Sequence, residues 1–157
     1  YGRALRRDGL MVIHISNRYV NLRPVIAAHA LENGWIDWSW TGREIERFCC
    51  AFDRPYAGAS TLLDGTVVRL SDVRLTETMD ALHPFVAGLV GRNPGQEACI
   101  ATCGGLLAVA AARLQDGGDA IEMLTEGRRL HTPPERLSLA LTNSPALTAN
   151  GFAEKKR

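Results

Sequence analysis

The 157-residue sequence has no excess of charge of one sign and no long hydrophobic run. It contains 18 Lys and Arg residues and 17 Asp and Glu residues, which gives a formal net charge of +1 at pH 7. Tight nucleic-acid binders usually carry a surplus of positive charge, so this balance gives no electrostatic reason to expect one. The apolar run at residues 106–112 is far shorter than the roughly 20 residues that a bilayer span needs. We therefore expect no contact with a membrane.

Cysteine is scarce, and its spacing fits no common metal site. The four cysteines form no C-x-x-C pair, and no histidine lies at a zinc-ligand spacing from them. Cys49 and Cys50 lie inside a helical pattern, where both are expected to act as small hydrophobic residues. Burial is favoured over a disulfide, and a disulfide over a metal site. Because no signal peptide is visible, we expect a reducing, cytoplasmic location.

Known catalytic motifs are missing as well. The sequence has no P-loop, no G-x-G-x-x-G, no H-E-x-x-H and no G-x-S-x-G. It therefore yields no catalytic residue and no metal ligand. The candidate binding residues gather instead around the tryptophans, where Asp37 lies between aromatic side chains that offer a surface for a polar ligand. The alternative is that these tryptophans pack a helix onto a barrel. The candidate site comprises Trp35, Asp37, Trp38 and Trp40.

Hydrophobic residues make up 46% of the chain and charged residues 22%, which favours a folded core over disorder. An apolar run at residues 10–15 predicts a strand, and the spacing at 22–31 predicts a helix. From residue 36 to 40 apolar and polar residues alternate, which predicts a short extended segment. Thr41 and Glu44 form a capping box. The helix behind it has one apolar stripe, composed of Ile45, Phe48, Cys49 and Phe52.

Glycine turns divide the rest of the chain into short strands. Asp64-Gly65 is a two-residue hairpin signal between residues 60–63 and 66–70. Gly104-Gly105 predicts a second hairpin with strands at 97–102 and 106–111, and residues 120–124 are expected to pair with 128–131. A helix is predicted at 134–141, with Leu137, Leu139 and Leu141 partly buried. The fold class is mainly β with flanking helices (α+β): a small open barrel preceded by a strand–helix segment.

One stretch carries a pattern of residues that is typical of a known family. Its members are Gly34, Ile36, Asp37, Trp38, Ile45, Glu46, Ala51, Phe52, Pro55, Gly58, Ala59, Thr61, Gly65, Val68 and Arg69. In these residues the stretch resembles the C-terminal domain of formyltransferases of the methionyl-tRNA formyltransferase type. The sequence departs from the family pattern at Ala57, where proline is usual, and at Cys50, where arginine is frequent. Weaker likenesses follow at residues 83–90, 99–107 and 129–133.

The resemblance implies an open, oligonucleotide-binding-like barrel over residues 34–132. In this family, 10-formyltetrahydrofolate binds an N-terminal catalytic domain, whose histidine motif does not occur in this sequence. The chain would then bind no cofactor itself and would hold the acceptor, while the catalytic domain lies upstream. That acceptor is an amine on a nucleotide-linked amino sugar or on methionyl-tRNA, and the near-neutral charge favours the small molecule. Whether the chain alone is an enzyme stays open.

Two other interpretations remain. The chain could be a stand-alone, non-catalytic binding module on the same barrel. Alternatively, residues 3–30 resemble spermidine-synthase-like methyltransferases, although they hold no cofactor motif, and the chain would then be the end of such an enzyme. Tyr1 suggests a fragment of a longer protein. We expect a lead-in at residues 1–33, a formyltransferase C-terminal-like barrel at 34–141, and a loose polar tail at 142–157.

Overall fold

The computed structural model describes five segments of the chain, namely residues 32–76, 86–91, 98–142, 146–148 and 151–153. The strand predicted at 10–15, the helix predicted at 22–31 and the likeness of residues 3–30 lie outside them. So do residues 83–85 of the first weaker family likeness, at residues 83–90. In the described part, no helix is long and apolar enough to cross a membrane.

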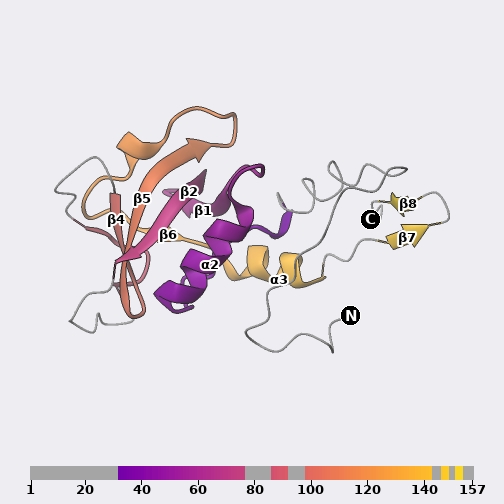
Figure 1. Cartoon of the computed structure of the whole chain (residues 1–157), viewed down its shortest axis with the longest axis horizontal. Coiled ribbons are helices and arrows are strands. Elements are labelled where there is room, and N and C mark those ends of the chain that lie inside the picture. The colour runs from indigo at the N-terminus through magenta and orange to yellow at the C-terminus, as the bar shows by residue number, and fades with distance from the viewer. Residues whose placement is uncertain (1–31, 77–85, 92–97, 143–145, 149–150, 154–157) are drawn as a thin grey trace.

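A six-stranded antiparallel sheet forms the body of the protein (Figure 1). The strand order is β3-β4-β5-β2-β1-β6. The sheet curls so far that its two edges meet, because Leu89, beside β3, bridges to Arg129, beside β6. This mainly β, barrel-like architecture with flanking helices confirms the predicted fold class. The strands are β1 (Ala59–Leu63), β2 (Thr66–Thr76), β3 (Val90–Gly91), β4 (Ala98–Thr102), β5 (Gly105–Leu114) and β6 (Leu130–His131).

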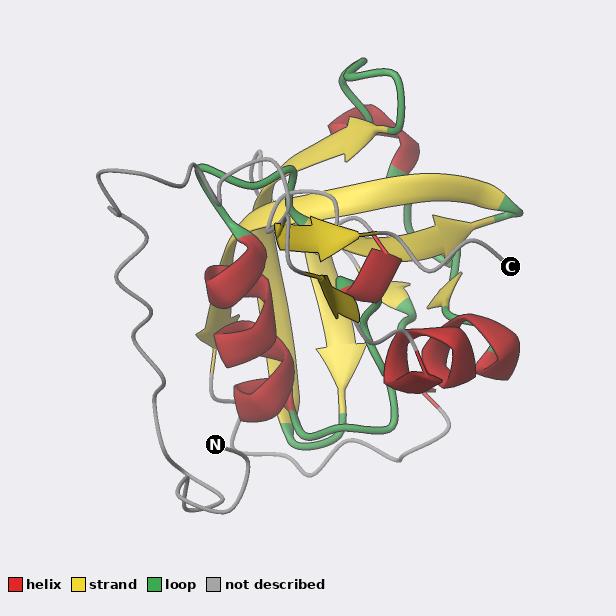
Figure 2. Ribbon diagram, turned by 90° about the vertical axis from the view of Figure 1, so that its right-hand side faces the viewer, coloured by secondary structure: helices red, strands yellow, loops and turns green. Residues whose placement is uncertain are grey.

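Helix α2 (Gly42–Phe52) begins at the capping box predicted from the sequence. The Thr41 hydroxyl accepts the Glu44 backbone N–H, and the Glu44 carboxylate accepts the Thr41 N–H at 2.9 Å. The Thr41 N–H, and then the Thr41 hydroxyl, which also donates to the Glu44 carboxylate at 2.8 Å, lower the pKa of the Glu44 carboxyl. The helix lies along the sheet (Figure 2) and buries Ile45 and Cys49 against it. The predicted apolar stripe is therefore the face that packs on the core.

The hairpin between β1 and β2 turns at the dipeptide predicted for it. Asp64 and Gly65 both have positive φ, 48° and 83°, which is the backbone that a tight two-residue turn requires. β2 continues to Thr76, beyond the predicted end at residue 70. It continues because residues 71–76 pair with β5, and Asp72 takes a positive φ of 51° within the same register.

Two predicted turns need correction. The second hairpin turns at Cys103-Gly104, one residue earlier than predicted, since Thr102 pairs directly with Gly105. Residues 120–124 do not pair with 128–131: residues 121–123 form the 3₁₀ helix η2 (Ile121–Met123), and β6 pairs with β1. The Asp119 carboxylate accepts the Ile121 N–H at 2.9 Å, a local bond that favours a turn over a strand.

Helix α3 (Pro134–Thr142) follows the predicted boundaries closely. Leu139 was predicted to be partly buried, but its side chain is 41% exposed. The stretch from residue 142 onward, predicted to be loose, contains a two-stranded antiparallel hairpin of β7 (Ala146–Thr148) and β8 (Gly151–Ala153). In this hairpin Leu147 is the backbone register partner of Phe152.

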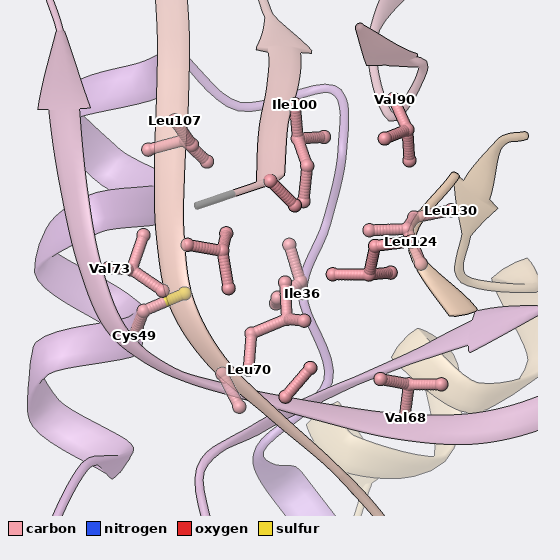
Figure 3. Packing of buried hydrophobic residues seen from close by; sticks show 14 of the residues in the cluster. Ile36, Cys49, Val68, Leu70, Val73, Val90, Ile100, Leu107, Leu124 and Leu130 are labelled. Atoms are coloured by element: carbon pink, nitrogen blue, oxygen red, sulfur yellow. The ribbon is translucent and has the colours of Figure 1, made fainter. Parts of the chain in front are cut away.

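The core lies between the curled sheet and α2. Figure 3 shows side chains from α2, the strands and the segment before α2 pointing toward one another. Burying this much apolar surface is the main stabilising contribution to the fold, at roughly 25 cal/mol per Å². The fully buried large side chains are Ile36, Ile45, Leu63, Leu70, Ile100, Leu107, Leu130, Val68, Val90 and Val109.

Candidate functional site

The tryptophan segment is extended only at its start. Trp35 forms a parallel bridge with Ser60 of β1, and the Ile36 backbone N–H donates to the Ser60 carbonyl at 2.9 Å. A turn follows, in which the Trp40 N–H donates to the Asp37 carbonyl at 3.2 Å. The predicted extended segment is therefore wrong for residues 38–40. The alternating burial is preserved nevertheless, with Ile36 and Trp38 buried and Ser39 exposed.

Trp38 is a core residue with a specific polar partner. Its side chain is 8% exposed, and its indole N–H donates to the Thr61 hydroxyl at 2.9 Å. The same hydroxyl donates to the His131 carbonyl at 3.1 Å. A buried indole N–H needs such a partner. Trp38 therefore joins the segment before α2 to β1 and β6.

Trp35 is covered by a residue from the C-terminal part of the chain. Its side chain is 7% exposed, and the Arg136 guanidinium of α3 lies 5.1 Å from its ring centroid. A cation over an indole face at this distance is an attractive cation–π contact. No sequence pattern predicts this role of Arg136, because its partner lies 101 positions earlier and no motif links the two residues.

Asp37 and Trp40 are the accessible members of the predicted set. Asp37 is half-buried, and one carboxylate oxygen accepts both the Ser39 N–H at 2.9 Å and the Ser39 hydroxyl at 2.7 Å. The partly buried Trp40 ring meets Phe48 of α2 edge-on, with 5.2 Å between centroids. An acid and an aromatic ring thus lie on one turn, close to solvent.

The structure therefore separates the four predicted binding residues into two pairs. Trp35 and Trp38 are buried and have structural partners, whereas Asp37 and Trp40 are partly accessible. All four belong to one short segment, but no ligand group tests the prediction that they bind an acceptor.

Two carboxylates of α2 fix the helix onto β2. Glu46 accepts the Leu75 backbone N–H at 2.7 Å, and Asp53, just beyond the helix, accepts the Asp72 N–H at 2.9 Å. Both bonds satisfy donors along the part of β2 that extends beyond the prediction. Glu46, one of the residues that carry the family resemblance, thus has a structural role.

The cysteines have different environments. All four are free; Cys49 is 1% exposed, whereas Cys50 is exposed, which corrects the expectation of burial for both. Burial raises the pKa of the Cys49 thiol to about 12, with smaller contributions from Cys50 and Asp53. Partial desolvation, then the nearby carboxylates of Glu46, Asp53 and Asp72, also raise the pKa of Cys50. In the described segments, no group of three or more His, Cys, Asp or Glu side chains could hold a metal ion.

The fold and this segment define a class of protein: a small barrel-like β domain with one capped helix against its core and an aromatic turn before that helix. Residues 30–125 match the family model described as "Formyl transferase, C-terminal domain". The match spans more than half of the chain, and the chain therefore belongs to this family. The resemblance noted from the sequence is confirmed.

Comparisons with curated proteins and with solved structures add little to the family match. No curated protein matches the chain. Among solved structures, a substituted variant of HypX from Aquifex aeolicus is similar, with 20% sequence identity and a TM-score of 0.42. The similarity covers 52% of this chain and only 14% of the HypX chain.

Proposed function

We propose that this chain is the acceptor-orienting part of a formyltransferase-like enzyme. The observation that carries the proposal is the family match over residues 30–125, which covers α2 and strands β1 to β5. The reaction is transfer of a formyl group from 10-formyltetrahydrofolate to an amine. In this proposal the donor and the catalytic residues belong to an upstream N-terminal domain, and this chain binds no cofactor.

Asp37 and Trp40 are the residues that we propose to contact the acceptor. A carboxylate can pair with a protonated amine or hydrogen-bond a sugar hydroxyl, and an indole edge offers an apolar wall beside it. Trp35 and Trp38 support the turn from behind, through Arg136 and Thr61. A rigid support of this kind limits the ordering cost of binding.

A nucleotide-linked amino sugar is the acceptor that we favour over methionyl-tRNA. The chain carries a net charge of only +1, whereas binding a long phosphate backbone draws on many Lys and Arg contacts. The accessible part of the candidate site is also short, since it comprises one turn. Both points favour a ligand of small size.

Tryptophan fluorescence of the full chain tests this proposal. We expect a nucleotide-linked amino sugar to change the emission saturably, and Asp37→Asn to weaken its affinity about tenfold, as expected for the loss of a charge-assisted hydrogen bond. Asparagine can still accept the Ser39 bonds, so the turn is kept. Asp116→Asn is the matched control, because the Asp116 carboxylate also accepts an N–H two residues later, from Gly118 at 3.0 Å.

Equal affinity of the Asp37 and Asp116 variants would contradict the assignment of Asp37. Saturable binding of methionyl-tRNA without binding of the amino sugar would contradict the choice of acceptor. In a second assay the chain is mixed with 10-formyltetrahydrofolate and the amine, and we expect no formyl transfer. Turnover there would overturn the proposal that catalysis belongs to another domain.

A further inference from the structure

A row of side chains crosses the face of the sheet opposite to the core. Register partners in neighbouring strands direct their side chains to the same face. Ser60 of β1 is opposite Arg69 of β2, and Arg69 is opposite Arg113 of β5. The row continues through bridges to Trp35 at one end and Asp119 at the other. It therefore places two arginines side by side in the middle of the sheet.

This pair of positive charges has no counter-ion among the described residues. Like charges directly opposite each other destabilise a sheet. The Nε atom of Arg69 is buried and has no hydrogen-bond partner in the described part of the chain. Asp119, the acid in the same row, uses its carboxylate to accept the Ile121 N–H at 2.9 Å. The row thus holds two guanidinium groups beside Asp119, whose carboxylate already stabilises a turn.

A pocket of about 210 Å³ borders the row at the β5 end. Its wall is formed by the small residues at 110–112, by Arg113, and by Gly117, Asp119 and Ile121 of the following loop. Small side chains leave the adjacent arginine open to a ligand from one side. Arg113 lines this pocket, and Arg69 is its register partner on the neighbouring strand. The pocket and the adjacent pair of guanidinium groups together indicate one ligand: a small anion.

We infer that Arg69 and Arg113 bind the phosphate groups of a small diphosphate compound on this face. Each guanidinium offers parallel N–H donors that fit phosphate oxygens. A dianionic or trianionic phosphate matches two adjacent positive charges better than one carboxylate does. Binding would offset the repulsion across the β2–β5 pair. This face is distinct from the Asp37 turn, and pyrophosphate binding can be measured without formyl donor or acceptor.

The size of the site favours a small ligand over a nucleic acid. A protein that neutralises 6–10 phosphates uses about as many basic contacts, whereas this row has two arginines. The next basic residue on the row, Arg136, lies over Trp35. Pyrophosphate is therefore the probe of choice, and a single-stranded oligonucleotide is the comparison.

Isothermal titration calorimetry of the full chain with pyrophosphate tests the inference. We expect 1:1 binding, which Arg69→Gln and Arg113→Gln each weaken about tenfold or more, the effect of losing a hydrogen bond to a charged group. Arg47→Gln is the matched control: Arg47 is an exposed arginine of α2, on the opposite side of the sheet, and its variant should bind as the parent does. Pyrophosphate should raise the melting temperature of the parent and of the Arg47 variant only.

Arg113→Glu keeps the test informative if Arg69→Gln fails to fold. This change removes the repulsion across the β2–β5 pair but places a carboxylate beside Asp119, so we expect a folded protein that has lost pyrophosphate binding. Binding that is equal in the parent and in all arginine variants would overturn the inference. Tighter binding of the oligonucleotide than of pyrophosphate would overturn the choice of a small ligand.

Discussion

Cys49 and Cys50 are neighbours in sequence with opposite surroundings. Successive helix residues point about 100° apart, so one thiol enters the core while the other faces solvent. Cys49 is 1% exposed and packs in the main cluster (Figure 3). Its raised pKa therefore couples protonation to folding, because the unfolded chain can ionise this thiol and the folded chain cannot.

We predict that the free energy of unfolding falls between pH 9 and pH 12 because of Cys49. The folded pKa is about 12, and the ordinary thiol value is 9.0. Below pH 9 the thiol is protonated in both states and its full contribution is present. Above pH 9 the unfolded state loses the proton first, so stability decreases by up to about 1.4 kcal/mol per pH unit. Urea unfolding followed by circular dichroism across this range gives the slope.

Cys49→Ala is the control for this slope. The variant loses some packing at every pH, yet it should show a flatter decline between pH 9 and pH 12. Parallel curves for parent and variant would mean that the thiol ionises equally in both states. That result would contradict the burial of Cys49.

At the scale of elements, the sequence predicts the caps and turns that depend on neighbouring residues. The capping box at Thr41 and Glu44 and the turn at Asp64-Gly65 depend on residues within four positions, and both formed as predicted. Contacts between residues far apart in the sequence cannot be predicted from local patterns. The indole of Trp38 finds its acceptor 23 residues away, and Thr61 finds the His131 carbonyl 70 residues away.

The same limit explains the errors in strand pairing. Nothing in residues 128–131 specifies their partner strand, and local patterns favour the nearest strand-like segment, whereas β6 pairs with β1. The turn at residues 38–40 was missed because alternating burial resembles a strand, whereas the Asp37 carboxylate stabilises a turn. For the candidate site, the sequence predicted which segment carries the tryptophans. It could not predict which side chains are covered by Arg136 and Thr61.

We predict that Trp38 and Thr61 are energetically coupled, because their hydrogen bond links three elements. Thr61→Val keeps the size of the fully buried side chain but leaves the indole N–H without an acceptor. We expect a loss of about 1–3 kcal/mol in the free energy of unfolding. In a Trp38→Phe background the loss should be smaller by about 1 kcal/mol, because the donor is already absent. Urea unfolding of the four variants, followed by far-UV circular dichroism, gives this coupling energy, and a value near zero would contradict the bond.

At the scale of the whole molecule, the barrel depends on the seam between residues 88–90 and 127–130. The Val90 N–H donates to the Arg128 carbonyl and the Leu130 N–H to the Gly88 carbonyl, both at 2.8 Å. This seam joins the two ends of the strand order, β3 and β6, and so turns an open sheet into a barrel-like one. Its contacts span about 40 residues of chain, so closing it carries a loop-entropy cost.

The close approach of the two chains at the seam requires a glycine at position 88. It has a positive φ of 79°, and a Cβ there would collide with the Leu130 carbonyl oxygen. Gly65 has a similar φ of 83°, but a Cβ there would meet no atom within 4 Å. We predict that Gly65→Ala costs about 1–2 kcal/mol, the penalty of the left-handed backbone alone, and that Gly88→Ala costs a further 1–3 kcal/mol or so from the collision.

Amide hydrogen exchange shows which part of the fold the substitution destabilises, and by how much. In the parent, the amides of Val90 and Leu130 should exchange slowly, because both donate across the seam. In Gly88→Ala these two should lose protection first, while amides inside α2, such as Ile45 and Cys49, keep theirs. Equal unfolding free energies for the two glycine variants, or uniform loss of protection, would mean that the seam does not close the sheet. Selective loss at Val90 and Leu130 would instead establish that barrel closure is a separate event from packing of α2 on the core, since α2 packs mainly on β2.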